Sequence, residues 1–160
     1  MGAMASKAGD VIDDVLLDVA VDIIVPHQIV KVQDINFATI ATDTPGDSIN
    51  ATMADTTGVV TSGSAHPVGT PTNGRVELIM SSSNLETISL DSTVTLTSAD
   101  GDEITYTPSF AQIGDTVPLA GDYVKKTYGI GGTLSQDIGT NGHYTGQLHV
   151  TLIADTGSGE

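Results

Sequence analysis

The sequence predicts an all-β protein, an antiparallel β-sandwich or Greek-key barrel preceded by a separate N-terminal strand. Apolar and polar residues alternate over many short stretches, and no stretch shows a helical repeat over several turns. Turn signals return about every eight to twelve residues, the spacing of a sandwich. Thr, Ser, Gly and Val dominate and Trp is absent, which also favours strands. We therefore expect about seven or eight strands in one domain.

The clearest element is at residues 15–25, where every odd position holds a large aliphatic side chain. These positions are Val15, Leu17, Val19, Val21, Ile23 and Val25. A period of two predicts one long strand with a single face meant for burial. Pro26 ends the strand, because proline cannot donate a hydrogen bond to a sheet ladder. Such a strand needs a groove, either in its own sheet or in a neighbouring molecule.

Further alternating stretches define the strands that follow. We expect these at residues 29–33, 34–40, 48–53, 58–62, 75–80, 85–90, 92–97, 103–107, 128–135 and 144–153. Residues 63–74, rich in Gly, Pro, Ser and Thr, are expected to form the longest loop, and the residues after Pro108 to be irregular. In the last strand Leu148, Val150 and Leu152 share one face, so we expect them in the core.

The expected organisation is a single sandwich domain with two appendages. Residues 1–26 form an N-terminal extension, residues 27–154 the domain and residues 155–160 a flexible tail. The opening Met-Gly-Ala-Met-Ala-Ser has neither a basic nor an apolar region of the kind found in signal peptides. We therefore expect that an export signal has been removed.

The charge and the lack of cysteine exclude several classes of protein. The formal net charge is −15, from 20 acidic and 5 basic residues, and a surface of this kind repels nucleic acid and anionic membranes. No apolar run reaches the roughly 18 residues that a membrane-spanning helix needs, so we expect no membrane insertion. With no cysteine, the chain has neither disulfides nor thiolate metal sites.

We expect no catalysis, no cofactor and no metal site. The four histidines, His27, His66, His143 and His149, form no helical i, i+4 pair with one another or with a carboxylate, so we interpret them as exposed residues. There is no Gly-x-Ser-x-Gly elbow and no phosphate-binding glycine loop. A hydrolase triad assembled only in space stays open.

Two acidic turns, at residues 43–47 and 100–103, offer oxygen ligands of the kind that Ca²⁺ prefers. Neither turn has EF-hand spacing, and Asp-Gly is a common turn sequence, so an ordinary turn is the favoured interpretation. Ca²⁺ binding at these turns stays open. Asn50-Ala51-Thr52 is a formal glycosylation sequon, a pattern that often arises by chance.

Both ends of the chain resemble known bacterial surface proteins. Residues 33–40 read Gln-Asp-Ile-Asn-Phe-Ala-Thr-Ile, which is similar to the signature Q-D-L-x-F-G-T-I of a family known only as a domain of unknown function. Ala38 stands where that family commonly has Gly. Residues 131–134 and 142–152 resemble its closing strand, G-x-Y-x-G-x-L-x-V-T-V. Cysteine-free major subunits of chaperone–usher fimbriae end in a similar strand, and they begin with an alternating extension followed by proline.

This resemblance implies a pilin-like, immunoglobulin-like antiparallel β-sandwich that lacks one strand, which the extension of the next subunit supplies. Residues 15–25 would then be the donor strand. The expected function is a structural subunit of an extracellular bacterial fibre or pilus at the cell surface. Its partners would be other copies of itself, with a periplasmic chaperone and an outer-membrane usher. Addition of a strand to a sheet edge agrees with the alternation of residues 15–25.

Two alternatives stay open. A carbohydrate-binding or adhesive sandwich would use residues 15–25 as its ordinary first strand. Such modules usually display aromatic rings, and this chain has only 2 Phe and 4 Tyr. A viral or phage shell protein would share the all-β fold.

Overall fold

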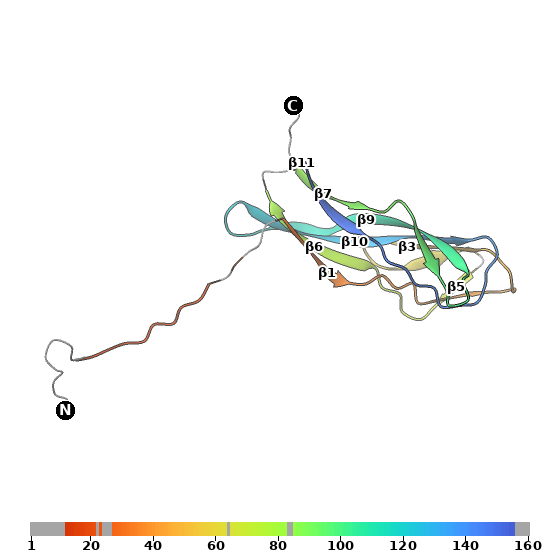
Figure 1. Cartoon of the computed structure of the whole chain (residues 1–160), viewed down its shortest axis with the longest axis horizontal. Helices are drawn as coiled ribbons and strands as arrows, with labels where there is room; N and C mark the ends of the chain where they lie inside the picture. Colours follow the sequence, from red (N-terminus) through yellow and green to blue (C-terminus); the bar gives the residue numbers. More distant parts are fainter. Residues whose placement is uncertain (1–11, 22, 24–26, 64, 83–84, 156–160) are drawn as a thin grey trace.

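The computed structural model confirms an all-β chain (Figure 1). It describes residues 12–21, 23, 27–63, 65–82 and 85–155, and these residues form no helix and so none able to cross a membrane. The eleven strands are β1 Gln28–Gln33, β2 Thr39–Thr42, β3 Ile49–Met53, β4 Val60–Ser62, β5 Ala65–Val68, β6 Gly74–Ser81, β7 Leu85–Leu90, β8 Val94–Thr97, β9 Glu103–Pro118, β10 Tyr123–Gln136 and β11 Val150–Asp155. This number exceeds the seven or eight strands expected. Four of the strands, β2, β4, β5 and β8, have only three or four residues.

The long strand β10 organises the largest sheet. Its first part pairs with β6, from Tyr123 opposite Ser81 to Ile130 opposite Gly74, and its second part pairs with β3. Along its other edge it pairs with β9. The sheet continues with β1 beyond β6, β4 beyond β3 and β8 beyond β9, and every pairing is antiparallel.

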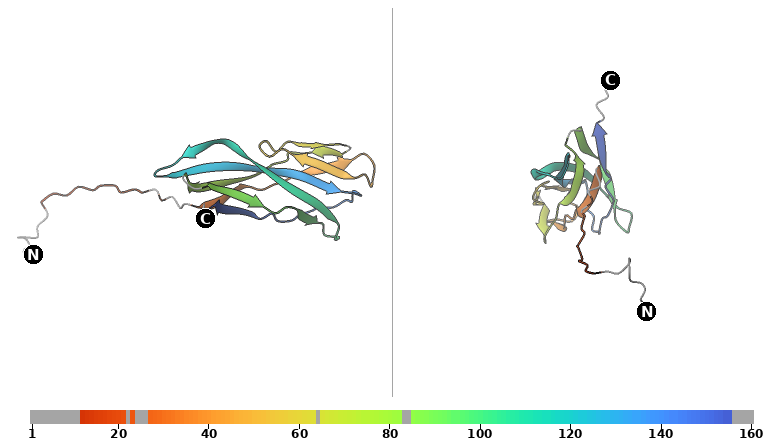
Figure 2. Two further views of the ribbon diagram at one scale, coloured as in Figure 1. Left: turned by 90° about the horizontal axis from the view of Figure 1, so that it is seen from above. Right: turned by 90° about the vertical axis from the view of Figure 1, so that its left-hand side faces the viewer.

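A second layer, made of β7 and β11, packs on the main sheet and completes the sandwich (Figure 2). Between the layers, Ile88 of β7 joins the buried side chains Val76, Leu78, Met80, Tyr128 and Ile130 of β6 and β10. Leu148, Val150 and Leu152 pack against this core as expected, but they are only partly buried. The antiparallel β-sandwich is therefore confirmed, with its last strand incompletely covered.

The small sheet of β2 and β5 covers the other part of the main sheet. Phe37 precedes β2, and its ring meets the ring of Tyr106 edge-on, with centroids 5.9 Å apart. Ile35, Phe37 and Ile40 each contribute to the two apolar clusters in this part of the domain.

The expectation of irregular chain after Pro108 is wrong, because β9 runs through this residue to Pro118. The reason is the position of the neighbouring strand. β8 begins with Val94 opposite Tyr106 and runs away from Pro108, so Pro108 lies where β9 pairs with β10 alone. Here the missing N–H of proline does not have to serve two ladders. β10 accordingly begins at Tyr123 rather than at residue 128.

Three other boundaries differ from the sequence expectations. Residues 65–68, expected in the longest loop, form β5 against β2. The strand expected at residues 34–40 is reduced to an isolated bridge at Asn36, followed by β2. Between them Ala38 has a φ of 62°, the left-handed region that favours glycine, which breaks the strand. The last strand begins at Val150 instead of residue 144.

Candidate functional site

The alternating segment of the extension is exposed in the structure. Val15, Leu17, Val19, Val21 and Ile23 are between 76% and 91% exposed. The described residues of this segment form no strand, and Figure 1 shows them running away from the domain. Val25, the sixth predicted donor position, lies outside the described residues.

This segment offers an unusually large apolar surface for its length. Burial of one large aliphatic side chain stabilises by roughly 1.5–3 kcal/mol, so the five described odd positions hold on the order of 10 kcal/mol in burial that their own domain does not use. Asp18 lies between them and would point to the opposite side of a regular strand. The segment therefore carries an apolar face, an acidic face and a backbone without ladder partners among the described residues.

Two strand edges of the domain also lack a ladder partner among the described strands. Among the described strands, β1 pairs only with β6, and β11 pairs only with β7. The two strands contact each other without forming a ladder, and β11 ends at the end of the domain where β1 begins (Figure 2). Their partly buried side chains Ile29, Val150 and Leu152 pack on the main core. An added strand at this position would have a free edge beside it and apolar side chains below it.

The chain before β11 extends this unpaired region. The sequence alternation begins at Tyr144, but ladder pairing with β7 begins only at Val150. Thr145 forms an isolated bridge with Thr97, and residues 146–149 belong to no described strand. Leu148 nevertheless packs against two of the apolar clusters. Residues 146–149 therefore continue the alternation of a strand, but they have no ladder partner among the described strands.

Two histidines pair with carboxylates that are distant in the sequence. His66 Nε2 lies 2.9 Å from Asp43 Oδ1, and His149 Nδ1 lies 3.2 Å from Asp91 Oδ2. The backbone N–H of His149 also donates to Asp91 Oδ2, and this hydrogen bond is the main cause of the lowered pKa of Asp91. Sequence analysis missed both pairs because their members are 23 and 58 residues apart. All four side chains are exposed by more than a third, so both pairs are contacts at the surface of the domain.

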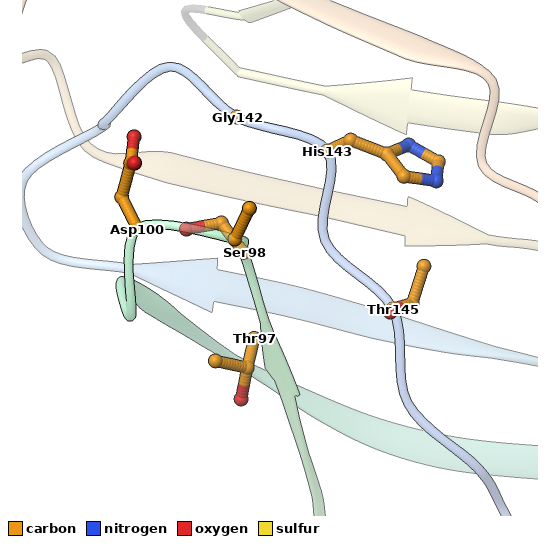
Figure 3. Close-up of a pocket in the computed structure, with 7 residues that line it drawn as sticks. Thr97, Ser98, Asp100, Gly142, His143 and Thr145 are labelled. Carbon is orange, nitrogen blue, oxygen red and sulfur yellow. The ribbon is translucent and has the colours of Figure 1, made fainter.

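A hollow of about 390 Å³ lies between the turn after β8 and the loop before β11 (Figure 3). It is lined by Thr97, Ser98, Ala99, Asp100, Gly142, His143 and Thr145. The Asp100 carboxylate and the His143 ring point away from each other, so they do not form a catalytic pair. In the part of the chain that the structure describes, no group of three or more His, Asp or Glu side chains gathers as a metal site.

In the first acidic turn, the carboxylate of Asp47 accepts a hydrogen bond from within the turn. Asp47 Oδ2 accepts the backbone N–H of Thr44 at 3.1 Å, and the N–H of Asp47 donates to the carbonyl of Thr44. In the second turn, Ser98 Oγ accepts the N–H of Asp102. These hydrogen bonds are those of ordinary turns.

Comparison with known families gives a match over most of the chain. The model of a family described as "Domain of unknown function (DUF4402)" matches residues 28–154. The matched range begins with the first residue of β1 and reaches into β11, so it contains both unpaired edges. No curated protein and no solved structure gives a significant match.

Proposed function

The chain belongs to this DUF4402 family, whose function is unknown, and we propose that it is a structural subunit of an extracellular bacterial fibre. The subunits would assemble by donor-strand exchange. The observation that carries this proposal is the coexistence, in one molecule, of an exposed alternating segment and two adjacent strand edges that have no partner among the described strands. The alternating segment lacks a strand edge to pair with and an apolar surface to cover its odd-numbered side chains. The two strand edges lack a neighbouring strand.

In the proposed assembly, residues 15–25 of one subunit form a strand between β1 and β11 of the next. Backbone groups of the donor would form ladders with both edges, which gives affinity independent of side chains. The odd-numbered aliphatic side chains would pack with Ile29, Val150 and Leu152 on the main core. Asp18 and Asp22 would face outward, so the acidic positions would avoid burial.

Such a linkage would be long-lived. Release of the donor would expose its apolar face and both strand edges at once, so dissociation would have a high barrier. This behaviour suits a structural polymer. A fibre at the cell surface, with a chaperone that covers the edges before export and an usher that exchanges them, belongs to the same proposal.

The alternative of a glycan-binding module has weaker support. Sugar-binding surfaces use exposed aromatic rings, but here Tyr106 and Tyr128 are buried and Phe37 packs against Tyr106. Phe110 is 39% exposed, and its ring packs against Tyr128. The hollow of Figure 3 has no Phe, Tyr or Trp among its lining residues. A shell protein would assemble into closed particles, which electron microscopy distinguishes from filaments.

The test compares the same charge on the two faces of the donor segment. Val21→Asp would place a carboxylate against the core of the neighbour, where an unpaired buried charge costs several kcal/mol. Ala20→Asp adds the same charge one residue away, on the face that points outward. We expect Val21→Asp to abolish filaments in electron microscopy and SDS-resistant ladders on gels, and Ala20→Asp to keep both.

Two outcomes would overturn the proposal. One is a wild-type protein that stays monomeric at high concentration after removal of any chaperone. The other is identical polymerisation of the two variants, since alternation would then have no role in insertion. Far-UV circular dichroism of both variants checks that the domain itself remains folded.

A further inference from the structure

We infer that the junction Val25-Pro26-His27 bars the extension from the β1 edge of its own domain, so that only a second copy of the chain can accept it. This inference rests on the proposed function and names its partner. The extension is joined to β1 almost directly, so insertion into its own domain would require a hairpin at this junction. The chemistry of the junction decides which hairpins can form.

The register of β1 defines the face that the extension would have to match. Ile29 pairs with Leu78, which is fully buried, and packs on the main core. Val30 pairs with Glu77 on the opposite face of the sheet. Residues directly opposite each other in antiparallel strands share a face. A productive hairpin must therefore place an odd-numbered residue of the extension opposite Ile29.

A two-residue loop fails this requirement. With Pro26 and His27 as the loop, Val25 would pair with Gln28 and Ile24 would pair with Ile29. All odd-numbered aliphatic residues would then face away from the core, because a shift of one residue reverses both faces. Asp18 and Asp22 would instead point toward the apolar interior, at the cost of burying carboxylates.

The backbone also opposes a two-residue loop. Tight hairpins use turns whose first loop residue has a positive φ. Proline fixes φ near −65°, so Pro26 cannot occupy that position.

A three-residue loop would give the correct face but conflicts with Pro26. With Val25, Pro26 and His27 in the loop, Ile23 would pair with Ile29. The common loop of this length is a type I turn followed by a left-handed residue, and His27 already has a φ of 58°. Proline is disfavoured at the second corner of a type I turn, because it excludes the residue before it from the α region. Pro26 stands at this corner.

In the wild-type sequence, longer loops either reverse the apolar face that drives insertion or shorten it. A four-residue loop reverses the faces again. A five-residue loop restores them but removes Ile23 and Val25 from the strand. The extension of a second copy has no such restriction, because no loop connects it to the β1 that it joins. The exposure of Val15, Leu17, Val19, Val21 and Ile23 agrees with an extension that leaves its own edge open.

The experiment removes the block from the full-length chain. Pro26→Asn combined with His27→Gly provides residues suited to the second corner and to the left-handed position of a three-residue loop. We expect this double variant to close on itself, with at least tenfold less polymer than wild type by sedimentation. Residues 15–23 should be protected from protease in its monomer, and its melting temperature should rise. His27→Gly alone, which keeps Pro26, should polymerise like wild type.

A second variant guards against misfolding of the first. Insertion of Gly-Gly after Pro26 lengthens the loop without changing β1 or the donor, and it should give the same protected monomer. If wild type and both loop variants polymerise equally, the inference is wrong but the proposed function stands. If wild type is itself a monomer with a protease-protected extension, its own domain accepts the segment and both conclusions are wrong.

Discussion

Tyr106 combines burial, a hydrogen bond and an aromatic contact in one side chain. It is 3% exposed, its hydroxyl donates to the carbonyl of Gly131, and its ring contacts Phe37. Burial raises the pKa of its phenol, and the nearby charge of Asp55 raises it further. The folded domain therefore keeps Tyr106 neutral at pH values where an unfolded chain ionises it.

Replacement of Tyr106 by Phe tests this role. At pH 7 the variant loses the hydrogen bond to Gly131, and we expect its free energy of unfolding to fall by about 1–2 kcal/mol. The raised pKa means that wild-type stability is complete below the ordinary tyrosine pKa near 10 and declines as the pH rises above it. The Phe variant should lack this part of the alkaline decline. Urea unfolding at pH 7 and in the alkaline range measures both effects, and an unchanged alkaline slope would contradict the assignment.

Residues around Gly131 explain why the resembling passage at residues 131–134 has glycine. A Cβ at Gly131 would lie 2.3 Å from the carbonyl oxygen of Met53, a backbone atom that cannot yield easily. A Cβ at Gly129 would lie 2.1 Å from the carbonyl oxygen of Asp55. The glycines of β10 thus allow the loop after β3 to lie directly on the sheet.

At the scale of elements, the free edges of the domain are not equivalent. β4 and β8 are edge strands of three and four residues, lengths that discourage pairing with another chain. β1 and β11 each have six residues, lie next to each other and carry apolar side chains toward the core. Natural sheets usually protect such edges, so this pair is the place where an added strand would satisfy the most backbone groups.

A peptide can test this element without polymerisation. A chain that begins at His27 keeps all eleven described strands but has no donor segment. We expect it to bind a synthetic peptide of residues 15–26, and a hundredfold excess over the dissociation constant would stabilise it by about 2.7 kcal/mol. Thermal unfolding with increasing peptide measures the shift. A peptide of the same composition with the odd and even residues exchanged should give none, and equal shifts from both peptides would argue against insertion by face.

At the scale of the whole molecule, charge opposes the proposed assembly. Each subunit has a formal net charge of −15, so a growing fibre brings like charges together. Salt screens this repulsion, because the Debye length falls from about 30 Å at 0.01 M to about 8 Å at 0.15 M ionic strength. Apolar burial and ladder hydrogen bonds depend much less on salt.

We therefore expect assembly to accelerate several-fold over this range of ionic strength. Light scattering during assembly at fixed protein concentration measures the rate, and Val21→Asp is the matched control that should not scatter at either salt concentration. Slower assembly at higher salt would show instead that complementary charges on the two subunits guide their encounter.

The sequence pattern alone determined the features that depend on residues close together in the chain. The alternation of residues 15–25 and 144–153, the turn sequences and the absence of helical periodicity led to the all-β fold and to the packing of Leu148, Val150 and Leu152 against the core. The family match over residues 28–154 agrees with the resemblance seen at both ends of the chain. These features could be predicted because side-chain direction in a strand is set by the backbone itself.

Pairing between distant segments was decided only by the tertiary structure. Pro108 lies within a strand because the β8–β9 ladder reaches only to Tyr106, and Asp91 meets His149 because β7 pairs with β11. The adjacency of the β1 and β11 edges has the same origin, since the chain between them builds the rest of the sandwich. Alternation predicts that one face of a strand will be buried. The neighbour that buries this face depends on contacts between residues that are far apart in the sequence. This is why the proposed donor segment was visible in the sequence while its proposed acceptor was not.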